Sequence, residues 1–272
     1  MYPLGYGDGL NDARTLPADF FSILLVSFPG SIDHERWAAL STDVLRGHIV
    51  GPTDEFELEA RRRGYRWIAG LDEAGRGPLA GPVVAAAVVL PTRCRLVGVD
   101  DSKQVSESER VRLYEVIVQR ARGVGVGVAT EEEIDRLNIL EATRLAMCRA
   151  LASLTPPADC LLIDAVTLPD LAVPSRSIIK GDTLSMSIAA ASIVAKVTRD
   201  RMMVAYHLTY PDYNFLSHKG YGTEEHLQRL AQHGPCAIHR RTFAPVAQFL
   251  NGSSGRSPLW RTGLGESSRT IQ

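Results

Sequence analysis

The segment 71–82, LDEAGRGPLAGP, constrains the fold more than any other part of this sequence, because it places two acids and three glycines between two apolar runs. The flanking runs, 66–70 and 83–91, have strand length and are rich in β-branched or small apolar residues, which predicts two buried strands joined by a glycine turn. A carboxylate removed from water requires a partner. We therefore expect Asp72 and Glu73 to be paired, hydrogen-bonded or bound to a cation.

The composition is that of an ordinary soluble domain and leaves its partners open. With 272 residues, 45% of them hydrophobic and 22% charged, the chain is long enough for one ample domain with a sizeable core. The formal net charge of −1 is compatible with a nucleic-acid partner, since a neutral total can combine a basic face with an acidic pocket. The four cysteines show no CxxC spacing, which argues against a zinc site and a disulfide framework.

Neither a membrane span nor a secretory signal is expected near the start of the sequence. The most apolar stretch there, residues 20–28, is far shorter than the roughly 20 residues that cross a bilayer. Asp8 and Asp12 precede it, and Arg14 is the single basic residue ahead of it, so a basic leader is missing. We therefore predict a cytoplasmic protein.

Three parts of the chain differ in how strongly they indicate regular structure. Residues 1–52 show no clear pattern, and we expect a weakly structured or accessory N-terminal extension. Residues 53–250 contain closely spaced helix and strand patterns with clear boundaries, and they are expected to form the functional domain. Residues 251–272 are rich in Gly and Ser, which predicts a disordered tail.

The order of the predicted elements favours a mixed sheet covered by helices. Strands are expected over 66–73, 83–90, 123–130, 156–166 and 175–182. Helices are expected over 54–64, with Asp54 as cap, and over 106–122, 131–154, 184–208 and 223–234. The glycines of the third strand permit a neighbouring backbone to approach closely. A doubly wound nucleotide-binding fold is the nearest alternative, but its glycine loop leads into a helix, whereas this glycine loop leads into a strand.

Acids end two of the predicted strands, and another lies on a predicted helix. Asp72 and Glu73 end the first strand, Asp164 ends the fourth, and Asp200 lies on the helix 184–208. Such acids can converge across the top of a sheet, where they repel one another unless one is protonated or a divalent cation neutralises them. Oxygen ligands without cysteine or a histidine cluster favour Mg²⁺ or Mn²⁺ over zinc.

The adjacent acids Asp72 and Glu73 raise a geometric problem, because neighbours on a regular strand point to opposite faces. Gly75 and Gly77 follow directly, and we expect the chain to turn there so that Glu73 swings toward the side that Asp72 faces. The alternative is that the acid pair belongs to an ordinary solvated turn.

Six stretches of the sequence, in this order, resemble the motifs of bacterial ribonuclease HII. They are IAGLDEAGRGPLAGPVVAAAVVL, DDSKQVSESER, EEIDRLNILEAT, KGDTLSMSIAAASIVAKVTRDRMM, HKGYGTEEH and GPCAIHRRTFAPV. The resemblance covers about residues 56–248, and so many ordered stretches make it highly specific. It implies an α/β ribonuclease H-like fold with a central mixed five-stranded sheet, flanking helices and a C-terminal helical region.

The resemblance also implies a site at which four acids hold Mg²⁺ or Mn²⁺ for catalysis, here Asp72, Glu73, Asp164 and Asp200. Members of this family hydrolyse RNA that is paired with or joined to DNA, including single ribonucleotides embedded in duplex DNA. They cut on the 5′ side of the ribonucleotide and leave a 3′-hydroxyl and a 5′-phosphate. We expect a monomeric endonuclease that removes misincorporated ribonucleotides and RNA primers, with no organic cofactor and no membrane association.

A ribonucleotide within DNA is distinguished by its 2′-hydroxyl, which a closely approaching backbone can sense. Gly75 and Gly77 have no side chain to keep the sugar away, Arg76 offers planar donors for phosphate, and the family resemblance assigns this triplet to the ribonucleotide. Tyr221, between two glycines, suits stacking on a sugar or base beside the following deoxynucleotide. The alternative for the triplet is a tight turn with a purely structural role. The alternative for Tyr221 is a tyrosine of the hydrophobic core.

Four further residues are expected to contact phosphate or the acids, namely Lys103, Lys180, Ser192 and Lys196. An ordinary surface ion pair between Lys196 and Asp200 competes with this interpretation, because residues four apart share a helix face. The segment 218–241 is rich in His, Lys and Arg and is expected to form a basic surface that faces phosphate.

One position departs from the family pattern, since Ala165 follows the third acid where glycine is usual; this puts the fine geometry of the turn in doubt. A type HIII ribonuclease H is the closest alternative enzyme, but its loop lacks the GRG triplet and it usually carries an N-terminal substrate-binding platform. A noncatalytic nucleic-acid binder is the alternative from another class, and the presence of all four acids argues against it.

Overall fold

The computed structural model describes residues 51–94, 96, 98–99, 105–169 and 171–250 of the chain. The predictions for residues 1–50, for Lys103 and for the tail 251–272 lie outside this part of the chain. All structural statements below concern the described residues.

The centre of the domain is a mixed five-stranded sheet with the strand order β3-β2-β1-β4-β5. The strands are β1 (Ile68–Ala74), β2 (Val83–Val89), β3 (Gly123–Ala129), β4 (Cys160–Asp164) and β5 (Ser175–Ile178). β2 is antiparallel to both β1 and β3, whereas β4 is parallel to both β1 and β5. The predicted mixed sheet is confirmed, and the glycine loop leads into strand β2, unlike the loop of the doubly wound alternative.

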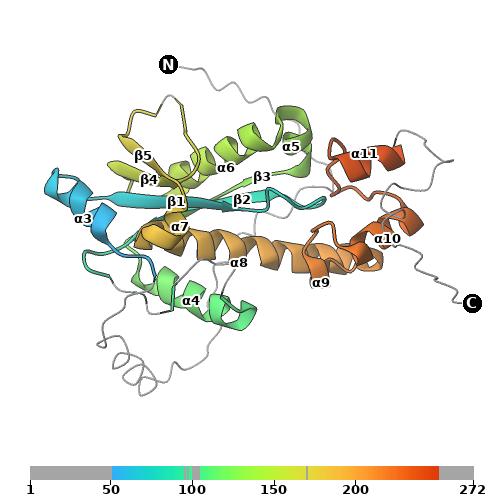
Figure 1. The fold of residues 1–272 in the computed structure, drawn as a ribbon, viewed down its shortest axis with the longest axis horizontal. Coiled ribbons are helices and arrows are strands. Elements are labelled where there is room, and N and C mark those ends of the chain that lie inside the picture. The colour runs from blue at the N-terminus through green and yellow to red at the C-terminus, as the bar shows by residue number, and fades with distance from the viewer. Residues whose placement is uncertain (1–50, 95, 97, 100–104, 170, 251–272) are drawn as a thin grey trace, which may run out of the picture. The chain divides into compact units, whose positions relative to one another are not determined.

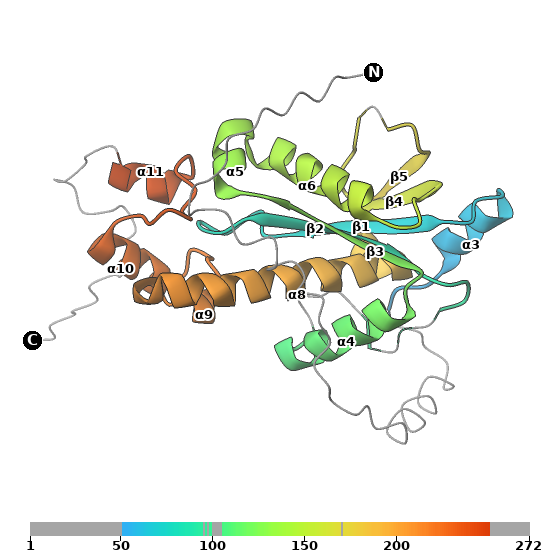
Figure 2. The ribbon, with the colours of Figure 1, turned by 180° about the vertical axis from the view of Figure 1, so that it is seen from behind.

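Two long helices cover the two faces of the sheet, α6 (Ile139–Ser153) on one and α8 (Met186–Thr209) on the other (Figures 1 and 2). Side chains alternate along β1 as expected for a buried strand. Leu71 belongs to the hydrophobic cluster that contains Met147 of α6, and Ile68 to the cluster that contains Ile188 of α8. Helix α4 (Glu107–Arg120) packs against α8 on the side away from the sheet.

The glycines of β3 allow α6 to lie directly on the sheet. A Cβ atom added to Gly127 would lie 2.1 Å from the carbonyl oxygen of Ala146, and one added to Gly125 would lie 2.1 Å from that of Ala150. No side chain other than hydrogen fits there. The predicted close approach of a neighbouring backbone is therefore confirmed.

The helix expected after Thr130 is two helices, α5 (Glu131–Leu137) and α6. Asn138 separates them: its φ of 73° interrupts the helical backbone, and its side chain accepts the N–H groups of Leu140 and Glu141 to begin α6. The prediction of one helix over 131–154 is wrong because asparagine tolerates this conformation and caps the new helix. Asp54 occupies the predicted N-cap position of α3 (Glu55–Arg62), but its side chain makes no capping hydrogen bond.

The remaining helices belong to the C-terminal half, and α7 (Gly181–Leu184) lies beside the start of α8 (Figure 1). The others lie near the end of the sheet at which β1 leads into the glycine loop, and they are α9 (Phe215–His218), α10 (Glu224–His233), α11 (Ala244–Leu250) and the 3₁₀ turn η1 (Pro211–Tyr213). Phe215 and Ile238 pack on Ala80 of the glycine loop and on Met203 of α8. The C-terminal helical region is thereby joined to the loop by its own small core.

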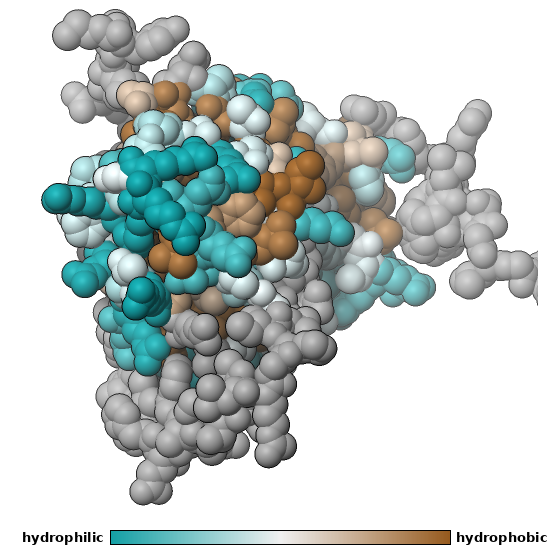
Figure 3. All heavy atoms as spheres, turned by 60° about the vertical axis from the view of Figure 1, so that its left-hand side comes forward, coloured by the Kyte–Doolittle hydropathy of each residue, from teal (hydrophilic) through white to brown (hydrophobic). Residues whose placement is uncertain are grey.

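The opposite end, where α3 lies, is largely hydrophilic. Figure 3 turns this end toward the viewer and shows hydrophilic side chains gathered over it, with smaller hydrophobic areas between them. Arg62, Arg63 and Arg66 are exposed in this region. Within the described residues, no helix combines the length and the apolar character needed to cross a bilayer. The four cysteines are free.

Candidate active site

Asp72 and Asp164 lie on neighbouring strands at the same end of the sheet. β1 and β4 are parallel and pair as far as Leu71 and Ile163, so the next residue along each strand is one of these acids. Alternation along the strands directs both carboxylates to the face that α8 covers. The predicted meeting of acids at two strand ends is therefore explained by strand register.

The environment of Asp72 disfavours a negative charge. Its residue is 5% exposed, and burial raises the pKa of its carboxyl well above the ordinary value, assisted by the charges of Glu73 and Asp164. Hydrogen bonds oppose this effect in part: the side chain of Ser192 on α8 and the backbone N–H of Glu73, 2.7 Å away, both stabilise the carboxylate. A divalent cation would relieve the repulsion among these oxygens, so the donor chemistry fits Mg²⁺ or Mn²⁺.

Glu73 stays within the paired strand. It lies opposite Ala85 of β2, and Ala74 is still paired with Val84, so the turn begins only after both acids. The expected turn at Glu73 is therefore wrong, although the charge of Glu73 still acts on Asp72. Oε1 of Glu73 instead accepts a hydrogen bond from Nη1 of Arg76 at 3.1 Å.

A preformed metal cage is not present in the part of the chain that the structure describes: no three His, Cys, Asp or Glu side chains are arranged closely enough to hold an ion. The assignment of four acids to one metal site therefore stays a prediction. What the structure provides is the electrostatic contact of Asp72 with Glu73 and Asp164.

A fifth acid, Asp182, belongs to helix α7, which contacts β4, and the sequence motifs did not single it out. The N–H of Gly181 donates to Oδ1 of Asp164 at 2.7 Å, which brings the start of α7 against the end of β4. Asp182 follows directly and is 8% exposed. The signal was present in the KGD stretch between the fifth strand and the long helix. Lys180 of the same stretch is exposed, with a left-handed φ of 57°.

Asp200 lies further along α8 than Ser192, which contacts Asp72. Eight residues of helix separate them, or about 12 Å along the axis. Oδ1 of Asp200 accepts a hydrogen bond from Nζ of Lys196 at 2.7 Å, and the two side chains are 10% and 17% exposed. The ion pair exists, as the alternative proposed, but it is largely buried rather than on the surface.

The GRG triplet and Tyr221 lie side by side. Arg76 and Gly77 are exposed, and a Cβ atom on Gly77 would lie 4.0 Å from Cε1 of Tyr221. Tyr221 is 42% exposed, so the core-tyrosine alternative is wrong, and Nζ of Lys196 lies 5.7 Å from the centre of its ring. Gly75 is buried with a φ of 99°, and a Cβ atom there would lie 2.1 Å from Nε of Arg199.

The histidines of segment 218–241 do not form the predicted basic surface. His218, His226 and His239 are buried around Phe215, with ring centres 4.4 Å apart for the first two. Burial lowers the pKa of His226 to about 4 and that of His239 to about 3, so both are neutral near pH 7. Arg240 is buried as well. The prediction is wrong for these residues, which form part of the core of the C-terminal region, whereas His233 and Arg241 of the same segment are exposed.

Ala165 has a φ of 46°, in the left-handed region that glycine adopts without strain. The turn beyond Asp164 therefore keeps a glycine-like backbone although the side chain is alanine. This result locates the departure from the family pattern at a strained residue next to a site acid.

The fold and the site together define a ribonuclease H-like α/β protein with acids at the ends of two adjacent central strands. A family model for ribonuclease HII matches residues 69–246. Ribonuclease HII of Bacillus subtilis strain 168 is 55% identical over 194 residues, which cover 71% of this chain and 76% of that protein. Ribonuclease HII of Geotalea uraniireducens strain Rf4 is 53% identical over 196 residues, with 72% and 91% covered.

Among solved structures, ribonuclease H2 from Pyrococcus horikoshii OT3 is similar with a TM-score of 0.60 and 28% identity, over 68% of this chain and 98% of that one. The chain belongs to the ribonuclease HII family. It is a ribonuclease H, an endonuclease that acts on RNA–DNA hybrids, and its family depends on divalent metal ions.

Proposed function

We propose that this ribonuclease H also nicks duplex DNA on the 5′ side of a single embedded ribonucleotide and leaves a 3′-hydroxyl and a 5′-phosphate. One observation carries the proposal: the exposed Arg76 and Gly77 lie beside the exposed Tyr221, next to the acid-bearing end of β1. A backbone without side chains can approach the 2′-hydroxyl, and the tyrosine ring can stack on the next nucleotide. Such an enzyme would serve the removal of misincorporated ribonucleotides and RNA primers.

Asp72, Glu73 and Asp164 would hold Mg²⁺ or Mn²⁺. When bound there, such an ion would supply an activated water and charge stabilisation for the leaving oxygen of the phosphodiester. The chain itself orients the ligands: Ser192 bonds to Asp72, and the N–H of Gly181 bonds to Asp164. Arg76, which bonds to Glu73, offers its remaining donors to a phosphate.

The fourth carboxylate has two candidates. Asp200 was predicted from the sequence, and its ion pair with Lys196 places it toward Tyr221. Asp182 follows Gly181, which is bonded to Asp164, so it lies nearer to the other acids along the chain path. We favour Asp182 as the fourth acid and assign Lys196, with Lys180, to the substrate phosphates. We further propose that the protein acts as a cytoplasmic monomer without an organic cofactor.

The test uses three duplexes of equal length that contain one ribonucleotide, a run of ribonucleotides, or none. Each is incubated with the full-length protein in Mg²⁺, in Mn²⁺ or in EDTA, and the ends of the products are identified by ligation and phosphatase treatment. We expect metal-dependent nicks in the first two duplexes, with 5′-phosphate ends. Cleavage of the ribonucleotide run with no nick at the single ribonucleotide would refute the proposal.

A further inference from the structure

Two arginines are completely buried beneath the glycine loop, residues 75–82. Arg199 belongs to α8 and Arg240 to the segment between α10 and α11, and both are 0% exposed. The hydrogen bonds of their guanidinium groups within the described residues are donated to backbone carbonyls. Arg199 donates to the carbonyls of Ala80, Pro82 and Lys219, each at 3.0 Å. Arg240 donates to the carbonyls of Gly75, Arg76, Gly81 and Pro82.

The first half of the loop depends on Arg240 more than the second half does. The second half is also held by backbone bonds, from Leu79 to Gly220 and from Gly81 to Ile238. The carbonyls of Gly75 and Arg76, in contrast, are bound by Nη2 and Nη1 of Arg240. The planar guanidinium can reach both of these carbonyls and that of Gly81 at once, which a lysine ammonium on a single nitrogen cannot do.

Arg199 connects the loop to the element that carries Tyr221. Its Nη1 bonds to the carbonyl of Lys219, two residues before Tyr221, while Nε and Nη2 bond to the loop. The carbon between its amino groups lies 5.9 Å from the centre of the Tyr221 ring. The buried side chain of Arg199 thus links the GRG triplet to Tyr221 and fixes the distance between them.

Burying two guanidinium groups is energetically unfavourable, which makes a role in packing alone a poor explanation. Burial lowers the pKa of both, that of Arg240 to about 9. Glu131, 7% exposed at the start of α5, is the carboxylate whose charge acts on both arginines. Apolar residues would fill the same space without desolvating charge, but they would leave the loop carbonyls without donors.

We propose that Arg199 and Arg240 are positioning residues for ribonucleotide selection, which set the GRG triplet and Tyr221 at the separation that a ribonucleotide and its 3′ neighbour require. The inference rests on the proposed reading of a single ribonucleotide by this loop. Neither arginine touches the substrate in this role, because both act through backbone carbonyls of the loop.

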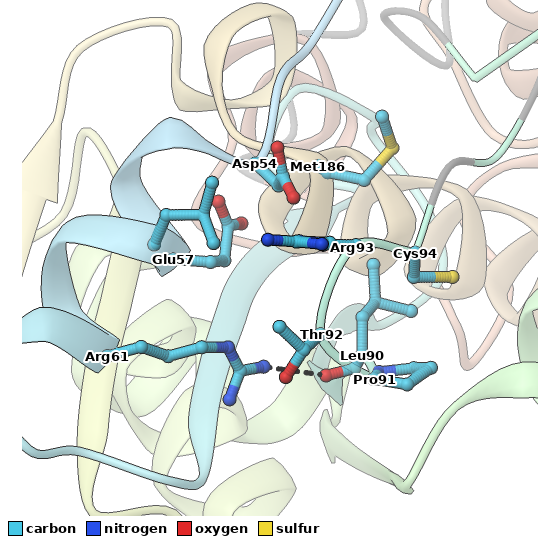
Figure 4. Close-up of a pocket in the computed structure, with 10 residues that line it drawn as sticks. Asp54, Glu57, Arg61, Leu90, Pro91, Thr92, Arg93, Cys94 and Met186 are labelled. Carbon is cyan, nitrogen blue, oxygen red and sulfur yellow. Dashed lines mark hydrogen bonds between the residues drawn. The ribbon is translucent and has the colours of Figure 1, made fainter.

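The test compares Arg240→Lys with Arg61→Lys. Arg61 is a matched control, since its guanidinium also bridges two backbone carbonyls, that of Arg66 at 3.0 Å and that of Leu90 at 3.1 Å. Figure 4 shows the bond to Leu90. It lies in α3, at the opposite end of the sheet. For each protein, kcat/KM is measured on the single-ribonucleotide duplex and on the ribonucleotide run, and the folded fraction is measured by circular dichroism.

The ratio of interest is kcat/KM on the single-ribonucleotide duplex divided by kcat/KM on the ribonucleotide run. We expect Arg240→Lys to lower this ratio by about ten- to a hundredfold while the protein stays folded. Arg61→Lys should leave that ratio unchanged. A purely structural role would lower both activities together and leave the ratio as it is, which would overturn the inference. If Arg240→Lys does not fold, the same ratio decides for Arg199→Lys, and failure of both to fold would show that the arginines serve the fold rather than the loop.

Failure of the proposed function looks different from failure of this inference. In the first case the unaltered protein itself does not nick at a single ribonucleotide. In the second, the unaltered protein does so and a folded Arg240→Lys variant keeps the same preference.

Discussion

The acid-bearing end of the sheet and the glycine loop adjoin each other, yet they are held in place by different interactions. Asp72 and Asp164 take their positions from the backbone pairing of β1 with β4. The loop takes its position from Arg199 and Arg240, and Arg240 is 165 residues away in sequence from Gly75. The acids at the sheet end therefore depend on regular structure, whereas the loop, and with it the proposed selectivity, depends on single side chains. The two parts should therefore respond differently to substitution.

The largest effect is expected where a charge is removed from the sheet end. Asp72→Asn should lower cleavage about 10²- to 10³-fold or more, because it removes a ligand charge at the reacting centre. It should also raise the melting temperature of the metal-free protein, since burial and two neighbouring acids disfavour the Asp72 carboxylate. Added Mg²⁺ should stabilise the unaltered protein more than the variant.

The matched control for this substitution is Asp212→Asn, an exposed acid of η1. It should change neither cleavage nor the Mg²⁺-induced shift in melting temperature. If the Asp72→Asn protein cleaves at the ordinary rate, the carboxylate of Asp72 at the end of the sheet is not needed for cleavage.

Acid should weaken the region that supports the loop. The pKa values of His226 and His239 are lowered in the folded state to about 4 and about 3, below the ordinary 6.5. Their contribution to the free energy of unfolding is therefore fully present above pH 6.5 and is lost as the pH falls toward 4. We expect each histidine to contribute a loss on the order of 3 kcal/mol over this interval, measured by urea unfolding at several pH values.

One carboxyl group opposes this trend. Burial raises the pKa of Glu131 to about 7, so its contribution decreases as the pH rises from its unfolded value of 4.5 toward 7. The two histidines outweigh this single group between pH 4 and 6.5. His226→Asn should flatten the pH dependence, whereas His233→Asn, at an exposed position, should leave it unchanged. If the free energy of unfolding of His226→Asn still falls steeply as the pH is lowered, groups other than His226 cause the acid sensitivity.

Substitution of the two candidates for the fourth acid should change cleavage to different degrees, and the difference is expected to be of intermediate size. Asp182→Asn should lower cleavage of a hybrid by about ten- to a hundredfold more than Asp200→Asn does, because α7 is bonded to Asp164 while Asp200 is paired with Lys196. Asp200→Asn should chiefly alter KM, through the released Lys196. A greater loss of kcat in Asp200→Asn would restore the assignment predicted from the sequence.

The smallest effect is expected at Ala165, where the backbone is strained. Ala165→Gly should raise the free energy of unfolding by about 0.5–1 kcal/mol, because glycine adopts a φ of 46° without steric penalty. Chemical denaturation measures the change, and Ala158→Gly is a control at a position without a left-handed φ. Unchanged or lower stability of Ala165→Gly would mean that the turn beyond Asp164 is not strained.

The sequence was sufficient to predict the strands and the meeting of Asp72 with Asp164. The apolar runs show the strand propensity of each segment, and the acid that follows each run marks the end of the strand. The sequence also suited Tyr221 to stacking rather than to the core, and this side chain is 42% exposed. It failed at Asn138, where one residue breaks a helix whose apolar spacing continues. It failed for the histidines of segment 218–241 as well, since polar residues in sequence were read as surface.

The sequence by itself determined the five-stranded sheet, the acids at its strand ends and the family, because each of these follows from periodicity or from motifs contiguous along the chain. The tertiary structure alone decided that Arg199 and Arg240 lie beneath the loop, that the helix of Asp182 contacts β4 and that His226 and His239 are buried and neutral. The physical reason is that these arrangements depend on contacts between residues distant in sequence. Burial, which sets the charge and the partners of such side chains, exists only once those segments have packed together.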